Sequence, residues 1–220
     1  MTNYFEHGLI SVVVITYNSE KFVLETLESI KTQSYQNIEL IISDDCSTDD
    51  TVVVCDQWVC SNKDRFAGVE LVKSPSNTGI PANCNRGVEV ANGRWIKIIA
   101  GDDELLPDCI QNNLDFTEKH HEVNAVCSRS RVYQGDLKES SFVGVSPSAH
   151  NIQHYFQNNQ SSYDQFCLLI HNNFIEAPTI FLKKDIVESV GYFDGRFRLM
   201  EDYPMWLKIT KAGHKIHFLN

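Results

Sequence analysis

The chain has 220 residues, with 19 Lys and Arg against 29 Asp and Glu, so its formal net charge is −10, and 42% of its residues are hydrophobic. These values are typical of one globular domain with its own core. No cluster of Lys and Arg is longer than a pair. Together with the acidic balance, this argues against a phosphate-backbone partner such as nucleic acid.

The cysteines and the hydropathy pattern indicate where the protein works. The seven cysteines are odd in number and form no CxxC pair, which disfavours both a zinc site and a disulfide framework. No stretch reaches the roughly 18 to 20 apolar residues of a spanning helix, and the N-terminus lacks the pattern of a signal peptide. We therefore expect a cytoplasmic protein, with peripheral contact at the inner face of the cell membrane left open.

The first 127 residues alternate between short apolar runs and helical patterns. Between the runs, apolar residues recur at helical spacing, which predicts successive βα units around a mostly parallel sheet. Runs rich in Val and Ile predict strands buried on both faces at residues 10–16, 39–43, 69–73 and 95–100. The helices are expected around Val23, Leu27 and Ile30, over 51–60 and over 81–91.

The second half is less regular. From about residue 132 to 177 the periodicity fails, which predicts a long irregular, substrate-facing excursion with one helix near 163–170. Regular structure then resumes, and the expected elements are a strand at 179–182, helices over 184–190 and 201–211, and a strand at 215–219. We expect a single domain over 1–220. Because the chain stops directly after the last run, a missing C-terminal part is left open.

Polar residues follow three of the four early strands. They occupy 16–18 (TYN), 44–49 (DDCSTD) and 101–104 (GDDE). In an open α/β sheet, ligands bind outside the carboxyl ends of the strands, so these residues are the candidates for chemistry. Two of the three ends are acidic, and their mutual repulsion is unfavourable unless a cation is present. Carboxylate oxygens favour Mg²⁺ or Mn²⁺, often held jointly with the phosphates of a substrate.

Five segments in register carry a family resemblance. They are SVVVITYN (11–18), ELIISDDCSTDDT (39–51), NTGIPANCNRG (77–87), GRWIKIIAGDDELLPD (93–108) and EDYPMWLKITKAG (201–213). With them the chain resembles the family 2 glycosyltransferases of GT-A fold, a Rossmann-like three-layer α/β/α sandwich with a mostly parallel central sheet. The resemblance implies an inverting enzyme that moves a sugar from a nucleotide diphosphate donor, expected to be a UDP-sugar, to an acceptor hydroxyl in surface polysaccharide or glycolipid biosynthesis.

The same resemblance assigns a donor-binding role to the half 1–127 and an acceptor-binding role to the half 128–220. The acceptor would be a saccharide or a lipid-linked saccharide. Tyr17 is similar to the aromatic residue on which the nucleotide base stacks, and Asp45 to the carboxylate that accepts a hydrogen bond from the base edge. For the neighbouring Asp44, the alternative role is to cap or brace the turn that follows the strand. The remaining residues implied in nucleotide-sugar binding are Thr16, Asn18, Asn77 and Asp102.

Residues 101–103 resemble the metal-binding DxD motif. Asp103 would bind the cation that bridges the diphosphate, while Asp102 would reach the ribose. Ala100 stands where the family often has another Asp, which leaves Asp103 as the single direct ligand of Mn²⁺ or Mg²⁺. Two further departures are Cys84 in place of a usual Arg, which removes a cation near the diphosphate, and Cys46 in place of a frequent Gly, so that turn must tolerate a side chain.

Asp202 is the expected catalytic base. It begins an amphipathic helix, whose N-terminus favours a carboxylate charge, and it matches the base of the family. Direct displacement at an anomeric carbon needs one carboxylate to take the proton of the acceptor hydroxyl, and no second acid. Glu201 would position the acceptor or Asp202.

Two other classes remain open at this point. A sugar nucleotidyltransferase would also combine an α/β sheet with acidic metal ligands, but it would show a Gly-rich loop with Arg after the first strand, where this chain has TYNSEKF. A non-catalytic sugar-nucleotide-binding module could keep the same fold. The presence of both Asp103 and Asp202 argues against that module.

Overall fold

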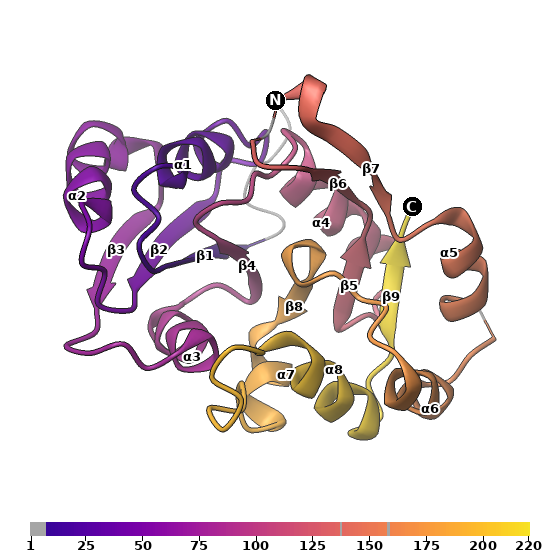
Figure 1. Cartoon of the computed structure of the whole chain (residues 1–220). Helices are drawn as coiled ribbons and strands as arrows, with labels where there is room; N and C mark the ends of the chain where they lie inside the picture. The colour runs from indigo at the N-terminus through magenta and orange to yellow at the C-terminus, as the bar shows by residue number, and fades with distance from the viewer. Residues whose placement is uncertain (1–7, 137, 158) are drawn as a thin grey trace.

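A computed structural model describes residues 8–136, 138–157 and 159–220. Its centre is a seven-stranded sheet of order β3-β2-β1-β4-β8-β5-β9 (Figure 1). Strands β1 to β4 are parallel, β8 is antiparallel to its neighbours β4 and β5, and β5 is parallel to β9. The strands are β1 (Ile10–Thr16), β2 (Ile38–Asp44), β3 (Gly68–Lys73), β4 (Trp95–Ala100), β5 (Ala125–Ser128), β8 (Phe181–Lys183) and β9 (Ile216–Leu219). The predicted, mostly parallel sheet is confirmed.

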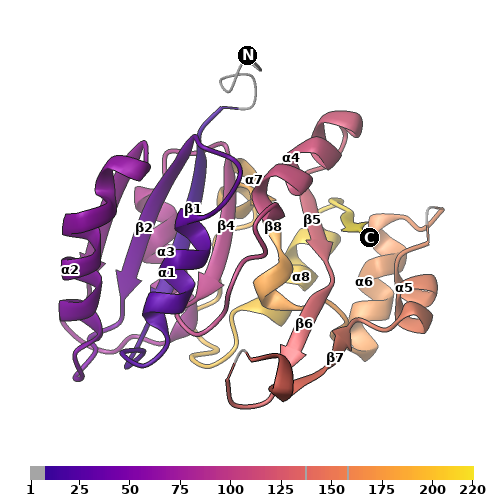
Figure 2. The ribbon, with the colours of Figure 1, turned by 90° about the horizontal axis from the view of Figure 1, so that it is seen from above.

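Helices cover both faces of this sheet and complete the three layers (Figure 2). Along β1, Val12 and Val14 belong to one hydrophobic cluster and Val13 to the other, so the strand is buried on both sides. One face carries α1 (Val23–Lys31), α2 (Thr51–Asn62) and α4 (Cys109–Lys119). The other carries α3 (Ile80–Val90), α6 (Ser162–His171), α7 (Lys184–Ser189) and α8 (Asp202–Lys211). A short 3-10 turn, η1 (Lys63–Arg65), follows α2.

The expectation of an irregular excursion over 132–177 is partly wrong. The predicted helix is present as α6, but the segment also holds an antiparallel hairpin, β6 (Ser130–Tyr133) and β7 (Phe142–Ser146), a 3-10 turn η2 (Glu139–Ser141) and a helix, α5 (Ala149–Tyr155). The hairpin strands are short and partly exposed, so they show little of the alternation that reveals a strand. The strand expected at 179–182 is present as the shorter β8, which begins at Phe181, and the 3-10 turn η3 (Ala177–Thr179) precedes it.

Gly87 sets the distance between α3 and the sheet. A Cβ atom at this position would lie 2.3 Å from Cγ1 of Val13 and 3.5 Å from Cβ of Ser43. Real Cβ atoms essentially never approach another atom this closely, so a side chain at position 87 would force Val13 or the helix to shift. Gly87 therefore lets α3 lie close against β1 and β2, and this places the loop before α3 beside the carboxyl ends of those strands.

We expect Gly87→Ala to lower the free energy of unfolding by about 1 to 3 kcal/mol, because overpacking a tight contact forces the backbone apart. Gly195→Ala is the matched control, since nothing lies within 4 Å of a Cβ there. Urea unfolding followed by circular dichroism measures both. Equal stability of the two variants would show that α3 can adjust.

Candidate functional site

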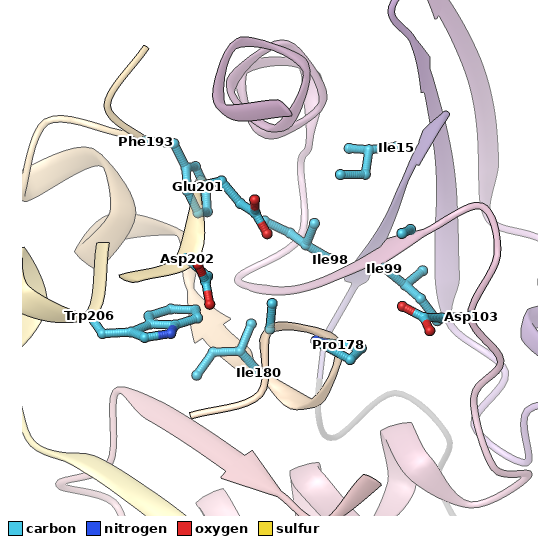
Figure 3. A pocket seen from close by; sticks show the side chains of 12 residues that line it. Ile15, Ile98, Ile99, Asp103, Pro178, Ile180, Phe193, Glu201, Asp202 and Trp206 are labelled. Atoms are coloured by element: carbon cyan, nitrogen blue, oxygen red, sulfur yellow. The ribbon is translucent and has the colours of Figure 1, made fainter. Parts of the chain in front are cut away.

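A cavity of about 150 Å³ lies at the carboxyl ends of β1 and β4, against η3 and the start of α8. Three carboxylates line it. Figure 3 shows Asp103 on one side and Glu201 and Asp202 on the other. The rest of the wall is mainly apolar and includes Ile15, Ile98, Ile180, Phe193 and Trp206. The predicted metal ligand and the predicted base, which come from different halves of the chain, therefore face the same space.

The pKa values of two of these carboxylates are raised above their ordinary values. Burial raises the pKa of Asp103 to about 6, and the negative charge of Asp102 adds to this, while Lys97 opposes it. The Asp103 carboxylate accepts no hydrogen bond from the residues that the structure describes. Burial also raises the pKa of Glu201, with a further contribution from Asp202. The cavity thus gathers three carboxylates, two of them with raised pKa values, and this arrangement would attract a cation.

The side chains that line the cavity suit the Mg²⁺ or Mn²⁺ ion that the family resemblance implies. Within the described residues, no group of three His, Cys, Asp or Glu side chains is placed to hold an ion. Asp103 alone, with its half-buried oxygens exposed to the cavity, matches the way in which Mg²⁺ and Mn²⁺ sites often combine one or two carboxylates with substrate phosphates. The residues present therefore fit a cation that is held by one protein carboxylate together with the phosphates of a bound substrate.

Lys97 is a buried cation that the sequence analysis missed. Its side chain is 1% exposed, and its Nζ donates a hydrogen bond to the carbonyl oxygen of Pro178 at 2.7 Å. Burial lowers the pKa of this ammonium group, which nearby acidic groups including Asp103 oppose. The bond joins β4 to η3, two walls of the cavity. A lone lysine in the apolar run WIKIIA was the available signal.

Asp202 occupies the first turn of α8, as expected. One of its oxygens, Oδ2, accepts a hydrogen bond from Nδ2 of Asn173 at 2.8 Å. Glu201 precedes it at the N-cap position and makes no side-chain capping bond. Trp206 lies one turn further along the helix and packs beside the carboxylate (Figure 3). Asn173 lies in a polar stretch with no motif, so nothing in the sequence pointed to it.

Asp45 does not line the cavity. Its carboxylate accepts hydrogen bonds from the backbone and hydroxyl of Thr78 and from the backbone of Gly79, and it pairs with Nη2 of Arg86 at 3.3 Å. Burial would raise the pKa of Asp45, but these bonds outweigh it and hold the pKa below its ordinary value. Both oxygens are thus engaged by the protein itself, and a nucleobase could reach them only by displacing one of these donors.

Arg86 supplies a cation in the segment 77–87, where Cys84 replaces the arginine that is usual in the family. It lies two positions after Cys84, and its guanidinium also contacts Thr78 Oγ1 at 2.8 Å and Asn83 Oδ1 at 2.8 Å. Its charge is directed at Asp45 rather than into the cavity. Cys84 is fully buried, and burial raises the pKa of its thiol well above the ordinary value, as expected for a core residue.

The turn after β2 is braced by Asp44. Its Oδ1 accepts a bond from Thr16 Oγ1 at 2.9 Å, and its Oδ2 accepts one from the backbone of Ser47 at 2.8 Å. Cys46 keeps a left-handed backbone with φ of 67°, a conformation that glycine adopts more easily. The turn therefore retains the geometry of a glycine turn although a side chain is present.

The other predicted donor-binding residues lie outside the cavity lining. Thr16 is buried, whereas Tyr17 is 49% exposed. Asn18 is exposed and accepts a bond from the backbone of Thr48 at 2.8 Å. Asp102 and Asn77 are also exposed, and Asn77 Oδ1 accepts a bond from Arg198 Nη2 at 3.0 Å. The cavity thus brings together Asp103, Glu201 and Asp202, while Thr16 and Asp45 lie beside each other at the neighbouring strand ends, where the backbone N–H of Asp45 donates to the carbonyl oxygen of Thr16 at 3.0 Å.

Comparison with known proteins gives one family. The family model described as Glycosyl transferase family 2 matches residues 11–191. WfaP of Escherichia coli, a UDP-Glc:alpha-D-GlcNAc-diphosphoundecaprenol beta-1,3-glucosyltransferase, is 29% identical over 96% of this chain and 74% of its own length. The putative glycosyltransferase EpsE of Bacillus subtilis is 35% identical over 94% of this chain and 68% of its own length.

Solved structures agree on the fold. TarS 1–349 of S. aureus in complex with UDP-GlcNAc superposes with a TM-score of 0.73 at 20% identity, over 96% of this chain and 55% of that one. The mannosyltransferase PcManGT from Pyrobaculum calidifontis, solved with GDP-Man and Mn²⁺, gives a TM-score of 0.70 at 19% identity, over 98% and 56%. The chain thus has the GT-A fold and spans slightly more than half the length of these two structures.

The raised pKa of Asp103 predicts a gain in stability when its charge is removed. Above pH 6 the folded protein holds an ionised buried carboxylate that is easier to ionise in the unfolded chain. Asp103→Asn should therefore raise the free energy of unfolding at pH 7.5 by about 1 to 2 kcal/mol, after a discount for partial exposure. The gain should shrink as the pH falls from 6 and vanish below about 4, where the carboxyl group is protonated in both states.

Thermal unfolding without divalent cations, measured from pH 4 to 8, tests this expectation. Asp64→Asn is the control, because Asp64 lies exposed on η1. A variant of Asp103 that is no more stable than wild type at pH 7.5 would contradict the assigned electrostatic penalty.

Proposed function

The chain belongs to glycosyltransferase family 2, and on this premise we propose that it moves one sugar from a UDP-sugar to an acceptor hydroxyl with inversion at the anomeric carbon. The observation that carries the proposal is the shared cavity of Asp103 and Asp202. A surface polysaccharide or a glycolipid is the proposed product, and the glucosyltransferase activity of the relative WfaP on a diphosphoundecaprenol-linked sugar supports this. Residues 1–127 would serve the donor and 128–220 the acceptor.

Donor binding is assigned to the residues around the first two strand ends. Tyr17 offers an exposed ring on which a base can stack, and Thr16, Asn18 and Asn77 border the same turns. Since its carboxylate is engaged, Asp45 would contribute by fixing the Thr78–Gly79 backbone. The complexes of TarS with UDP and UDP-GlcNAc support a uridine donor.

Asp103 would hold the cation, Mn²⁺ or Mg²⁺, and Asp102 would reach the ribose. When bound, the cation supplies positive charge to the departing diphosphate. The Mn²⁺ in the PcManGT structure supports a divalent ion. Asp103 would do this without a second carboxylate, since Ala100 has none.

Asp202 would act as the base in a single displacement. Its carboxylate takes the proton of the acceptor hydroxyl as the new bond from the acceptor oxygen to the anomeric carbon forms. The bond from that carbon to the diphosphate oxygen breaks, and its electron pair leaves with the diphosphate. Glu201, beside Asp202 on the cavity wall, would position the acceptor. Attack from the face opposite the leaving group inverts the configuration.

The rival classes make different predictions. The family match is to glycosyl transferases, which disfavours a nucleotidyltransferase. A non-catalytic binding module would bind UDP-sugars without releasing UDP. Incubation with UDP-glucose and UDP-GlcNAc, with and without Mn²⁺, separates the two outcomes by the UDP released.

We expect Asp202→Asn to slow turnover by about 10² to 10⁴, the usual contribution of a positioned base, because the amide keeps the size of the side chain but cannot accept the proton. Affinity for UDP should stay within about twofold of wild type. UDP release and calorimetric titration with UDP measure the two quantities. Full activity of this variant, or a retained anomeric configuration in the product by NMR, would remove Asp202 from its role.

The acceptor is proposed to be lipid-linked. The loop before Glu201 exposes Phe197, Leu199 and Met200, and Leu199 is 86% exposed. Apolar side chains next to the base would suit an amphiphilic acceptor at a membrane surface. No helix in the described ranges is long and apolar enough to cross a bilayer. The exposed apolar side chains of this loop are the basis for proposing peripheral contact at the inner face of the membrane, from the cytoplasm.

The double variant Phe197→Ser, Leu199→Ser should bind anionic phospholipid vesicles at least about tenfold more weakly than wild type, because two apolar anchors are lost. Val53→Ser, which removes a half-exposed valine from α2, is the control. Cosedimentation measures the binding. Equal vesicle binding by the double variant and the wild type would exclude this loop as the contact.

A further inference from the structure

Asn173 lies between α6 and η3 and touches the proposed base directly. Its Nδ2 donates to Oδ2 of Asp202 at 2.8 Å, and its Oδ1 accepts a bond from the backbone N–H of Ile175 at 3.2 Å. The amide nitrogen can only donate, and the amide oxygen can only accept. A flipped amide would place its oxygen against a carboxylate and its N–H₂ against an N–H. One orientation alone therefore satisfies both contacts.

The backbone that carries Asn173 is held by the core. Phe174 and Ile175, the next two residues, are 6% and 3% exposed, and the ring of Phe174 stacks on Tyr155 with centroids 4.2 Å apart. On the other side of the contact, the Tyr203 hydroxyl donates to the carbonyl of Leu169, which fastens α8 to α6. Both partners of the Asn173–Asp202 bond thus belong to one packed unit.

The surroundings of Asp202 offer little else to hold its carboxylate. The other charged side chains that line the cavity are Asp103 and Glu201, both acidic, while Lys97 is not among the lining residues and donates a hydrogen bond to the Pro178 carbonyl. In the described part of the chain, Asn173 is the side chain that donates a hydrogen bond to Asp202. Its bond occupies Oδ2 and leaves Oδ1 for another partner.

We propose that Asn173 is a positioning residue, which holds the Asp202 carboxylate through Oδ2 so that Oδ1 receives the proton of the acceptor. The proposal rests on the proposed function, since it acts through Asp202. It assigns the two oxygens different tasks, and it explains how a carboxylate that shares a cavity with two other acidic groups keeps one orientation. A charge-assisted bond of this kind is about twice as strong as a neutral one.

Asn173→Asp and Asn173→Ala test the proposal. The aspartate has the same shape and can still accept from Ile175, but it presents an oxygen to Asp202 in place of the N–H. Each variant should lower kcat for UDP release by about 10- to 100-fold, while KM for the UDP-sugar and affinity for UDP stay within about twofold. Asn172→Ala, a change at the exposed neighbouring residue, should leave kcat unchanged.

A double-mutant cycle separates positioning from a general structural role. Once Asp202→Asn has removed the base, adding Asn173→Ala should lower the remaining rate by less than about twofold, because there is no base left to position. If the double variant loses rate by the product of the two single losses, the substitutions act independently and the inference is overturned. Asn173 variants with wild-type kcat would overturn it as well. If Asp202→Asn alone were fully active, the proposed base would fail instead, so the two failures are distinguishable. A weaker affinity of Asn173→Ala for UDP would point to misfolding and also count against the inference.

Discussion

The burial of charge at the carboxyl edge of the sheet is the constraint on which the site depends. A charged group withdrawn from water must find partners or suffer a shift in its pKa. Asp45 is matched by donors from Thr78, Gly79 and Arg86, and Lys97 donates to the Pro178 carbonyl. Asp103 accepts no hydrogen bond from the described residues, and its pKa rises to about 6. Asp45, whose charge is balanced by hydrogen-bond donors of the protein, therefore shapes a loop, whereas Asp103, which has no such donors among the described residues, is available to a ligand.

Packing of the strands and of α3 brings these charges to one edge. The parallel register pairs Thr16 with Asp44 and Ile15 with Ala100, so the loops after β1, β2 and β4 begin at the same level. Gly87 lets α3 lie against β1, and Asp45 then reaches the backbone at the N-terminal end of this helix. A loop that is not held against the sheet would not offer backbone N–H donors at fixed positions to the Asp45 carboxylate. Close packing of the helix is therefore a condition for burying Asp45 as an ion.

The sequence predicted the first half of the fold well, because its strands are buried on both faces and leave continuous apolar runs. Strands β1 and β4 have the expected bounds. It missed the β6–β7 hairpin, because the two strands are short and partly exposed and a contact such as Arg131 over the Phe142 ring leaves no hydrophobic alternation in the sequence. Asp103 and Asp202 could be found from motifs. The partners of Asp45 and Asp202 could not, since those bonds join segments that only the tertiary fold brings together.

The three carboxylates of the cavity differ in what surrounds them, and this difference suits different tasks. Asp103 and Glu201 have raised pKa values because burial and neighbouring acids penalise their charge, which favours a role that begins when a cation or an acceptor arrives. Asp202 is instead held by a hydrogen bond from a rigid segment. A base must be oriented before its substrate binds, whereas a metal ligand gains its partner on binding. Asn173 therefore provides Asp202 with a side-chain hydrogen bond that fixes its orientation, whereas Asp103 accepts none from the described residues.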